Sequence, residues 1–358
     1  MPETNKLETN DLAPRPKIRV GVIRFSSLGD IVLTLNLISY LKQLVWIELY
    51  FITKEDFSPL VELECHHENV ITLNKNQSGW AQLNSLVTKI KKIKLDLIID
   101  LHGSLRSKLV SFLLFSIPII KFDKRILERK FHVLFKKKVY INEDSIVQRY
   151  LTEIFQLYFH RELEDPAFFQ LVGDSVKGSK QTYIAICPFA SFNSKQWDFL
   201  SFLKLAELIL TNSALSHYQL IWLGPKLANA QPQFSQMLDR YPDQMKDMLG
   251  KTSFQELAQY LGGAQLTITN DSGPLHLSEY LGGKVLAIFG PTHSSFGFAP
   301  KQTLSRMIDH DLPCRPCSTL GNKKCYLPQQ LCFTQTTPQM VYDIFLEMME
   351  LSHMKLNR

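Results

Sequence analysis

Residues 264–292 read AQLTITNDSGPLHLSEYLGGKVLAIFGPT, and the rest of the chain is organised around this stretch. Apolar runs at 264–269 and 284–289 predict two buried strands, and the segment 275–281 between them predicts a helix. A strand, a tight loop, a helix and a second strand in this order are typical of a βαβ unit, in which the two strands are parallel. The stretch therefore predicts an α/β fold built on parallel sheets.

The loop between the first of these strands and the helix has the chemistry of a phosphate site. Ser272 is expected to cap the helix, Pro274 suits its first turn, and Gly273 lets a ligand approach the backbone closely. N–H groups at the positive end of the helix dipole would then bind an anion. An ordinary strand-to-helix turn is the competing interpretation of this motif taken alone.

The same alternation of apolar strands and helices runs through both halves of the chain. Strands are predicted at 17–25, 46–53, 69–73, 95–101, 183–187 and 218–223, and helices at 31–43, 83–94, 197–211 and 254–261. The pattern breaks around 160–181. Two doubly wound domains in tandem predict a cleft between the carboxyl ends of their strands, where such folds bind ligands.

The predicted organisation has four segments. They are a disordered lead-in at 1–16, an N-terminal Rossmann-like domain at 17–170, a second Rossmann-like domain at 181–337, and a C-terminal helix at 338–358 that packs back on the first domain. With 358 residues, 45% of them hydrophobic, the chain can bury two cores. The chain has no apolar run of membrane-span length, and 1–16 lack the core of a signal peptide, so we expect a cytoplasmic protein.

The segment 81–140 is strongly basic, with fourteen lysines and arginines against four acidic residues. This imbalance predicts an anionic partner, which would be a phosphorylated lipid, a membrane surface or nucleic acid. A solvated basic face without a specific role is the alternative. The phenylalanines near the basic residues are spaced as for core packing, at Phe112, Phe115, Phe122, Phe131 and Phe135.

Four side chains could carry chemistry at the predicted cleft. Asp30 ends a strand–turn–helix corner, where it could act as a general base or simply stabilise the helix start. Lys195, in a polar loop, could neutralise a diphosphate or be an ordinary surface lysine. His102 and His276 lie at the edges of predicted elements, where a lone histidine is more often structural than catalytic.

The late cysteines Cys314, Cys317, Cys325 and Cys332 form a candidate metal segment. Four thiolates suit tetrahedral zinc, and the first pair has knuckle spacing. The second pair is too widely spaced for a zinc ribbon, so inert or redox-sensitive thiols remain the alternative. Several familiar motifs are missing: no Gly-x-Gly-x-x-Gly follows the first strand, and the chain has no phosphate-binding P-loop and no nucleophile elbow. These absences disfavour a nicotinamide-dependent dehydrogenase, a P-loop NTPase and a serine hydrolase.

Several segments, taken together and in order, resemble the ADP-heptose:lipopolysaccharide heptosyltransferases of glycosyltransferase family 9. The resemblance runs from about residue 17 to the end of the chain. The matching segments are RFSSLGD at 24–30, DLHGSLR at 100–106, SKQW at 194–197, GKTSFQELA at 250–258, TNDSGPLH at 269–276 and FGPT at 289–292. The run PCRPC at 313–317 also looks like the cysteine segment of that family.

This resemblance implies a GT-B fold with the acceptor on the N-terminal domain and the sugar nucleotide on the C-terminal one. It implies an inverting, metal-independent transferase in which Asp30 deprotonates the acceptor hydroxyl. The donor side would comprise Lys195, Ser194, Asp271, Ser272, Gly273, Pro274, Leu275 and His276. The acceptor side would comprise Ser27, Gly29, His102 and Arg106. The implied partners are ADP-heptose, a Kdo-bearing lipopolysaccharide core or lipid A acceptor, and the cytoplasmic face of the inner membrane.

Two positions depart from the family pattern. Many relatives carry a carboxylate just after the Gly-Pro turn of the second domain, but here residues 224–229 read GPKLAN. His102 stands where a glutamine is usual. A family member that uses another nucleotide sugar for a different surface glycan is therefore the first alternative. A nucleic-acid-binding protein with a zinc knuckle is a remote one, and a catalytically inactive sugar binder is disfavoured by the presence of Asp30 and Lys195.

Overall fold

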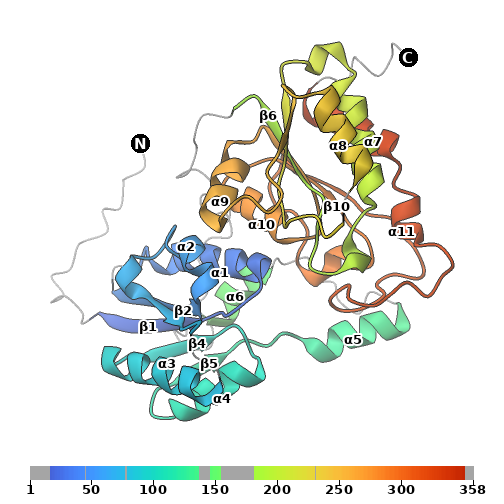
Figure 1. Ribbon diagram of the computed structural model, residues 1–358. Helices are drawn as coiled ribbons and strands as arrows, with labels where there is room; N and C mark the ends of the chain where they lie inside the picture. The colour runs from blue at the N-terminus through green and yellow to red at the C-terminus, as the bar shows by residue number, and fades with distance from the viewer. Residues whose placement is uncertain are drawn as a thin grey trace, which may run out of the picture.

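The computed structural model describes residues 17–44, 46–76, 79–136, 146–154, 181–229 and 231–350. These residues form two parallel sheets, one above the other in Figure 1, each with helices on its faces. The expected α/β fold with two doubly wound, Rossmann-like sheets is confirmed. The lead-in at 1–16 and, up to residue 180, the break predicted around 160–181 lie outside the described residues.

The first sheet has the strand order β3-β2-β1-β4-β5, with every pair of neighbours parallel. Its strands are β1 (Ile18–Ile23), β2 (Ile47–Lys54), β3 (Val70–Leu73), β4 (Leu97–Asp100) and β5 (Ile119–Lys121). Its helices are α1 (Leu28–Leu41), α2 (Ser58–Val61), α3 (Gly79–Ile93), α4 (Leu105–Leu113), α5 (Ile126–Phe135) and α6 (Ile146–Ile154). Because β1 lies between β2 and β4, its carboxyl end reaches the middle of the ligand edge.

The second sheet has the order β11-β10-β9-β6-β7-β8, and it too is parallel throughout. Its strands are β6 (Tyr183–Cys187), β7 (Gln219–Trp222), β8 (Met245–Asp247), β9 (Leu266–Asn270), β10 (Val285–Ile288) and β11 (Arg306–Ile308). Its helices are α7 (Phe199–Leu210), α8 (Pro232–Arg240), α9 (Phe254–Gly263), α10 (Gly273–Tyr280), α11 (Leu331–Thr334) and α12 (Pro338–Met348). The opening motif is thus β9–α10–β10, at the centre of this sheet.

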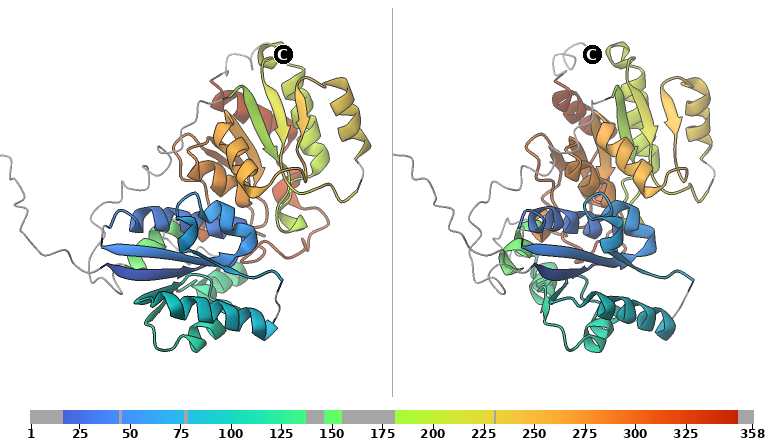
Figure 2. Two further views of the ribbon diagram at one scale, coloured as in Figure 1. Left: turned by 60° about the vertical axis from the view of Figure 1, so that its left-hand side comes forward. Right: turned by 90° about the vertical axis from the view of Figure 1, so that its left-hand side faces the viewer.

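Alternation of buried side chains along the strands places helices on both faces of the first sheet. Val20 and Val22 pack into the cluster shared with α1 and α2, whereas Ile23 and Ile98 pack with α3 and α4. Figure 2 shows α1 and α2 on the side of the second domain and α3 and α4 on the opposite side. The first sheet is therefore enclosed between two helical layers.

The two domains meet where helices α1 and α10 pack against each other, and one buried hydrophobic cluster spans both. Two glycines permit this contact. A Cβ on Gly273 would lie 2.6 Å from side-chain atoms of Leu28, and one on Gly29 would lie 2.9 Å from His276 Cδ2. Because neither glycine has a side chain, the first turns of the two helices approach closely, and the two motifs that contain them face each other.

Helix α12 does not pack back on the first domain over its described residues, so this expectation is wrong. Its apolar side chains Val341 and Phe345 are buried in the core of the second domain, and the helix packs against α7. Asn212 Nδ2 donates a hydrogen bond to the Tyr342 hydroxyl at 2.9 Å and fixes this position. The physical reason is that the apolar stripe of α12 has a partner stripe on the adjacent helix of its own domain.

The expectation that the phenylalanines of the basic segment pack in a core is also wrong. Phe112, Phe115, Phe131 and Phe135 are exposed, and only Phe122 packs inward, edge-on against Tyr150. In α4, the small side chains of Ser107 and Ser111 face the sheet together with Val110, so the phenylalanines point the other way.

None of the helices that the structure describes has the length and apolarity required to cross a bilayer.

Candidate active site

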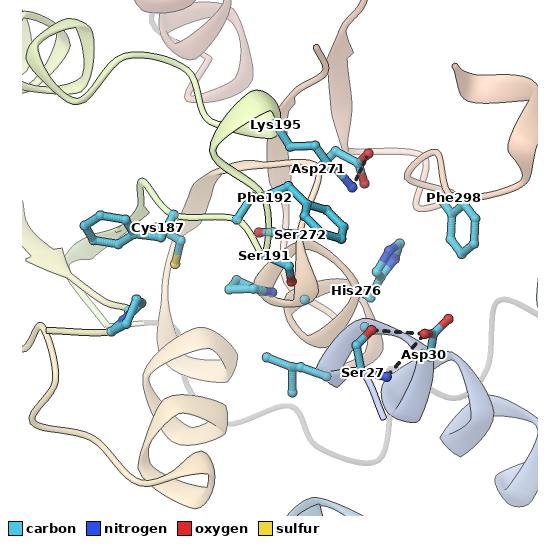
Figure 3. Close-up of a pocket in the computed structure, with 18 of the residues that line it drawn as sticks. Ser27, Asp30, Cys187, Ser191, Phe192, Lys195, Asp271, Ser272, His276 and Phe298 are labelled. Carbon is cyan, nitrogen blue, oxygen red and sulfur yellow. Dashed lines mark hydrogen bonds and ion pairs between the residues drawn. The ribbon is translucent and has the colours of Figure 1, made fainter. Parts of the chain in front are cut away.

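The main cavity has a volume of about 540 Å³ and lies between the carboxyl ends of the two sheets. Figure 3 shows side chains from both domains pointing into it. The turn from β1 to α1 forms its first-domain wall, and the loops after β6, β7 and β9 form its second-domain wall. The predicted cleft is therefore present, and its volume suits a small-molecule ligand.

Asp30 lies on the first-domain wall in the first turn of α1. Its Oδ2 atom accepts hydrogen bonds from Ser27 N at 3.2 Å and Ser27 Oγ at 3.0 Å, and it pairs with Arg24 Nη2 at 2.5 Å. Among the described residues, no group donates a hydrogen bond to Oδ1. Asp30 therefore stabilises the start of its helix, which was the alternative to a role as general base. Its second carboxylate oxygen, Oδ1, remains available to a ligand.

The charge state of Asp30 follows from these contacts. Burial by itself would raise the pKa of this carboxyl group. The ion pair and hydrogen bond with Arg24, together with the hydrogen bonds from Ser27, outweigh burial and hold the pKa below its ordinary value. Asp30 is therefore a carboxylate at neutral pH, in the state that a proton acceptor requires.

Arg24 is a site residue that sequence reasoning missed as such. It follows the last residue of β1 and is buried, with Nε donating to Ser26 O at 3.0 Å and Nη1 donating to Leu101 O. These bonds fix the guanidinium behind Asp30 while the carboxylate faces the cavity. The available signal was an arginine directly after the buried run 20–23 of β1, because a buried arginine needs an acidic partner.

Lys195 and Asp271 form the corresponding ion pair on the second-domain wall. Lys195 Nζ lies 2.7 Å from Asp271 Oδ2, which also accepts a hydrogen bond from Thr292 Oγ1 at 2.6 Å. Figure 3 shows the pair on the far side of the cavity from Asp30. Asp271 and Thr292 are buried, so they orient the ammonium group from behind. Thr292, in the last matching segment, was not predicted as a site residue.

The start of α10 lies beside this pair and lines the cavity with Asp271, Ser272, Gly273 and Pro274. Ser272 occupies the cap position, but its side chain makes no capping hydrogen bond; its hydroxyl lies 3.2 Å from Thr269 Oγ1 instead. The expectation that Ser272 caps the helix with its side chain is therefore wrong. Pro274 has no N–H group and Leu275 N donates to Ser272 O at 3.2 Å, so within the described first turn the Gly273 N–H is the group left for a ligand.

His276 lies between the two charged walls, one turn into α10, as Figure 3 shows. The ring is buried, and burial lowers its pKa to about 4 despite the nearby carboxylates Asp271 and Asp30. The imidazole is therefore neutral at pH 7 and adds no charge between the two walls. Its ring is 6.1 Å from that of Phe298, which also lines the cavity.

Several predicted site residues lie outside the cavity lining. Ser194 donates to Gly321 O, and Leu275 is part of a buried cluster behind α10. His102 packs edge-on against Phe25, and its pKa is lowered to about 4, chiefly by burial and then by the cations Arg24 and Lys124. Arg106 is exposed on α4. Ser27 and Gly29, by contrast, line the cavity beside Asp30.

The four late cysteines are free thiols in the structure. Cys317 Sγ donates to the carbonyl oxygen of Cys314, and Cys332 is buried, where burial raises the pKa of its thiol to about 11. Across the described residues, no three histidine, cysteine, aspartate or glutamate side chains converge closely enough to hold a metal ion. As arranged here, these thiols do not fit a tetrahedral zinc site.

Aromatic side chains on the second-domain wall also escaped prediction. Phe189 and Phe192, from the loop after β6, and Phe254, at the start of α9, line the cavity near the Gly224–Pro225 turn. Their common signal was position, because all three follow strands at the carboxyl edge of the second sheet, Phe189 and Phe192 after β6 and Phe254 after β8. They give this part of the cavity apolar surfaces suited to a flat ring system.

The arrangement as a whole places a carboxylate on one wall, and an ammonium group with a helix N-terminus on the other. A nucleophilic hydroxyl between them would have a proton acceptor on one side. A departing phosphate would meet positive charge on the other. This geometry suits a displacement in which a phosphate-bearing group leaves.

The sequence is similar to those of known proteins. The family model for glycosyltransferase family 9 (heptosyltransferase) matches residues 83–326. Lipooligosaccharide heptosyltransferase 2 of Campylobacter jejuni serotype O:2 is 29% identical over 289 residues, which cover 79% of this chain and 84% of that protein.

Two solved structures from E. coli share the fold. Heptosyltransferase WaaC with ADP aligns with a TM-score of 0.64 at 17% identity, covering 92% of this chain and all of that one (100%). ADP-heptose LPS heptosyltransferase II aligns with a TM-score of 0.65 at 15% identity, covering 94% of this chain and 100% of that one. The predicted GT-B arrangement of two sheets facing across a cleft is thereby confirmed.

Proposed function

Because the chain belongs to glycosyltransferase family 9, the heptosyltransferase family, we propose that it transfers heptose from ADP-heptose to the inner core of a lipopolysaccharide. The family resemblance seen in the sequence is confirmed, and with it the assignment as a glycosyltransferase. The acceptor we propose is a sugar of a Kdo-bearing lipid A core. The named relatives, which are lipooligosaccharide and LPS heptosyltransferases, support this choice.

The observation that carries the proposal is the placement of Asp30 opposite Lys195 and the start of α10 in one cavity. In the proposed reaction, Asp30 Oδ1 takes the proton of an acceptor hydroxyl. The hydroxyl oxygen forms a bond to the anomeric carbon of the heptose, and the bond from that carbon to the diphosphate oxygen breaks with its electron pair. Attack and departure on opposite sides invert the anomeric centre.

The products are then a new glycosidic bond, ADP and a proton held by Asp30. Lys195 and the Gly273 N–H at the positive end of α10 would stabilise the negative charge that develops on the leaving diphosphate. We assign Asp271 and Thr292 the task of orienting Lys195. The neutral His276 would contact the sugar or phosphate without adding charge. We assign no metal to this reaction, since Lys195 and the helix start supply the charge stabilisation.

For the donor side we propose that the adenine ring occupies the apolar part of the cavity near Phe189, Phe254 and the Gly224–Pro225 turn. The remaining predicted donor residues, Ser194 and Leu275, would act from behind the lining by shaping the loops that carry Lys195 and α10. For the acceptor side we assign Ser27 and Gly29 to direct contact. His102 and Arg106 would meet more distant parts of a large acceptor, since neither lines the cavity.

A second candidate function keeps the mechanism but changes the nucleotide. The turn after β7 reads GPKLAN, without the carboxylate that relatives place there for a ribose. A donor other than ADP-heptose, used for another surface glycan, would account for that difference.

A structural zinc site on the late cysteines, proposed from their spacing, is tested by metal analysis of the purified protein. About one zinc per chain would establish the site, and a folded protein without zinc would rule it out.

The deciding experiment is a thermal-shift panel of the full chain with ADP, UDP, GDP and CMP, followed by a transfer assay. A ligand that binds the folded state raises the melting temperature by mass action. We expect stabilisation by ADP alone and transfer from ADP-heptose to a Kdo-lipid A acceptor. Stabilisation by UDP or GDP alone would retain the mechanism and reassign the donor. No response to any nucleotide would contradict the proposed function.

A further inference from the structure

Helix α5 has its apolar face on the outside. The side chains of Ile126, Leu127, Phe131, Leu134 and Phe135 are all at least half exposed, with Leu127 and Leu134 at 70% and 71%. Their spacing of one and four residues places them on one face of the helix, and Phe131 and Phe135 stack with their ring centroids 5.9 Å apart. A surface helix of a soluble protein normally turns such a face inward.

The opposite face of α5 is polar and is the one that contacts the rest of the protein. Arg129 Nη2 donates to Phe296 O at 3.3 Å, and its guanidinium lies over the ring of Phe298 at 5.4 Å. His132 is buried and lies within hydrogen-bond distance of Ser295 Oγ. The second domain therefore holds α5 by its polar face and presents its apolar face outward.

Helix α4 repeats this arrangement. Leu105 and Phe112 lie on one stripe of the helix, and Phe115 lies in the turn directly after it. All three are strongly exposed, with Leu105 and Phe115 both at 85%. This stripe faces away from the first sheet, which contacts the other side of α4. Because α4 lies under the first sheet and α5 under loops of the second domain in Figure 1, both apolar faces point away from the second domain.

The charge around these faces is positive. From 105 to 136 the chain has eight lysines and arginines and two acidic residues, Asp123 and Glu128. Lys130 lies on the exposed face of α5 itself, and Lys108 lies on that of α4. Exposed leucine and phenylalanine side chains with lysines at their border are the chemistry of a helix that lies in the interface of an anionic bilayer.

We propose that the outer faces of α4 and α5 form a docking surface for an anionic phospholipid bilayer, with the apolar side chains inserted at the level of the headgroups. The outer faces are defined here by Leu105, Lys108 and Phe112 of α4 with Phe115 in the turn that follows it, and by Ile126, Leu127, Lys130, Phe131, Leu134 and Phe135 of α5. Positive charge around the apolar side chains selects a lipid surface over a second copy of this chain, because two such surfaces would repel each other.

The inference deepens the proposed function, since a lipid-borne acceptor is presented at a membrane, but its support comes from α4 and α5 alone. Docking on this side leaves the second domain facing away from the bilayer. Because α5 bonds directly to the segment of Phe296 and Phe298, the docked helix is connected to the cavity wall.

The test uses the full chain and vesicles of phosphatidylcholine with or without about a quarter phosphatidylglycerol, at low and at high salt. We expect co-sedimentation with the anionic vesicles that weakens with salt. The variant Leu127→Ser with Phe131→Ser and Leu134→Ser should lose binding at least about tenfold, because three apolar side chains leave the interface. Lys130→Gln should weaken binding about fivefold.

The matched control replaces three exposed leucines outside the surface, Leu63→Ser, Leu200→Ser and Leu304→Ser, and should bind vesicles like the unmodified chain. The inference is overturned if the unmodified chain does not bind anionic vesicles, or if the α5 variant binds them equally well. It is also overturned if the α5 variant differs only by dissociating from a dimer to a monomer on size exclusion, which would identify a second copy as the occupant.

A second measurement does not depend on a disruptive variant. Phe131→Trp keeps an apolar side chain at the outer face of α5, and its fluorescence should be quenched by brominated lipids when anionic vesicles are added. Unchanged fluorescence with bound protein would place the contact elsewhere. Stabilisation by nucleotide is measured in parallel. If the chain does not bind vesicles but the docking surface alone is at fault, nucleotide still stabilises the protein. If the proposed function is wrong, nucleotide does not stabilise the protein.

Discussion

Each wall of the cavity has one ion pair between a basic and an acidic side chain, and the two pairs differ in which partner is accessible. In the pair on the first domain the carboxylate is the accessible partner, since the Asp30 side chain is 27% exposed and that of Arg24 is 6%. In the pair on the second domain the cation is the accessible partner, since Lys195 is 16% exposed and Asp271 is 6%. In both, the deeper residue holds the outer one and balances its charge.

The comparison teaches that the deeper partner decides what each wall offers to a ligand. A buried arginine lets the protein present a carboxylate on the first-domain wall. A buried aspartate lets it present an ammonium group on the second-domain wall without leaving an unpaired charge in the core.

The largest effect is expected from Asp30→Asn. The amide keeps the size of the side chain but cannot accept the hydroxyl proton, so transfer should fall about 10³-fold or more. Stabilisation by nucleotide should be unchanged, because the donor wall is intact. The transfer rate and the thermal shift are measured together, with Asp198→Asn at the start of α7 as the control that should leave both unchanged. Full transfer by the Asp30 variant would remove this residue as the base.

Lys195→Ala is expected to weaken nucleotide binding about thirtyfold, because a charge-assisted contact to the diphosphate is lost. Titration calorimetry with ADP measures this, with the exposed Lys204→Ala on α7 as the control. Adding Asp271→Asn to the Lys195 variant separates two causes. Restored affinity would mean that the unpaired Asp271 carboxylate, rather than the lost ammonium contact, had reduced binding.

Arg24→Gln should reduce transfer at neutral pH on the order of tenfold, by loosening the position of Asp30. Arg24 holds the pKa of Asp30 low, so its removal raises that pKa. Because the reaction needs the ionised carboxylate, activity falls as the pH drops through this pKa. The acidic limb of the pH–rate profile should therefore move to higher pH in the variant. An unmoved acidic limb would mean that Arg24 acts only on stability.

The smallest effect is expected from Ser272→Ala, which tests the unused cap on the donor wall. Ser253 accepts a capping hydrogen bond from Glu256 N at 3.2 Å, so Ser253→Ala should cost about 1 kcal/mol in the free energy of unfolding. The Ser272 side chain makes no such bond, so Ser272→Ala should cost clearly less. Chemical denaturation of both variants gives the comparison. Equal losses would show that Ser272 does cap α10 in solution.

Much of the fold could be predicted from the sequence because buried parallel strands are short, continuous apolar runs bounded by turn residues. The strands β6 and β9 and the helix α10 lie within two residues of their predicted positions. Short elements with few apolar residues, such as β8, β11 and α8, were not predicted, because their positions depend on the neighbours they pair with or pack against.

The sequence also determined which loops line the cavity, since Asp30, Lys195 and the start of α10 all follow strands and so lie at the carboxyl edges of the sheets. It did not reveal which side chains would be partners. The contacts of Arg24 with Asp30 and of Thr292 with Asp271 depend on how separate strand ends are placed beside each other.

Only the tertiary structure decided which face of each helix is covered. Phe112, Phe115, Phe131 and Phe135 have the spacing of core residues, and periodicity cannot tell an inward stripe from an outward one. The same limit explains why α12 packs on α7 rather than on the first domain. An amphipathic pattern specifies that a helix has an apolar face, whereas the surface that covers this face, or the absence of one, depends on packing between segments far apart in the chain.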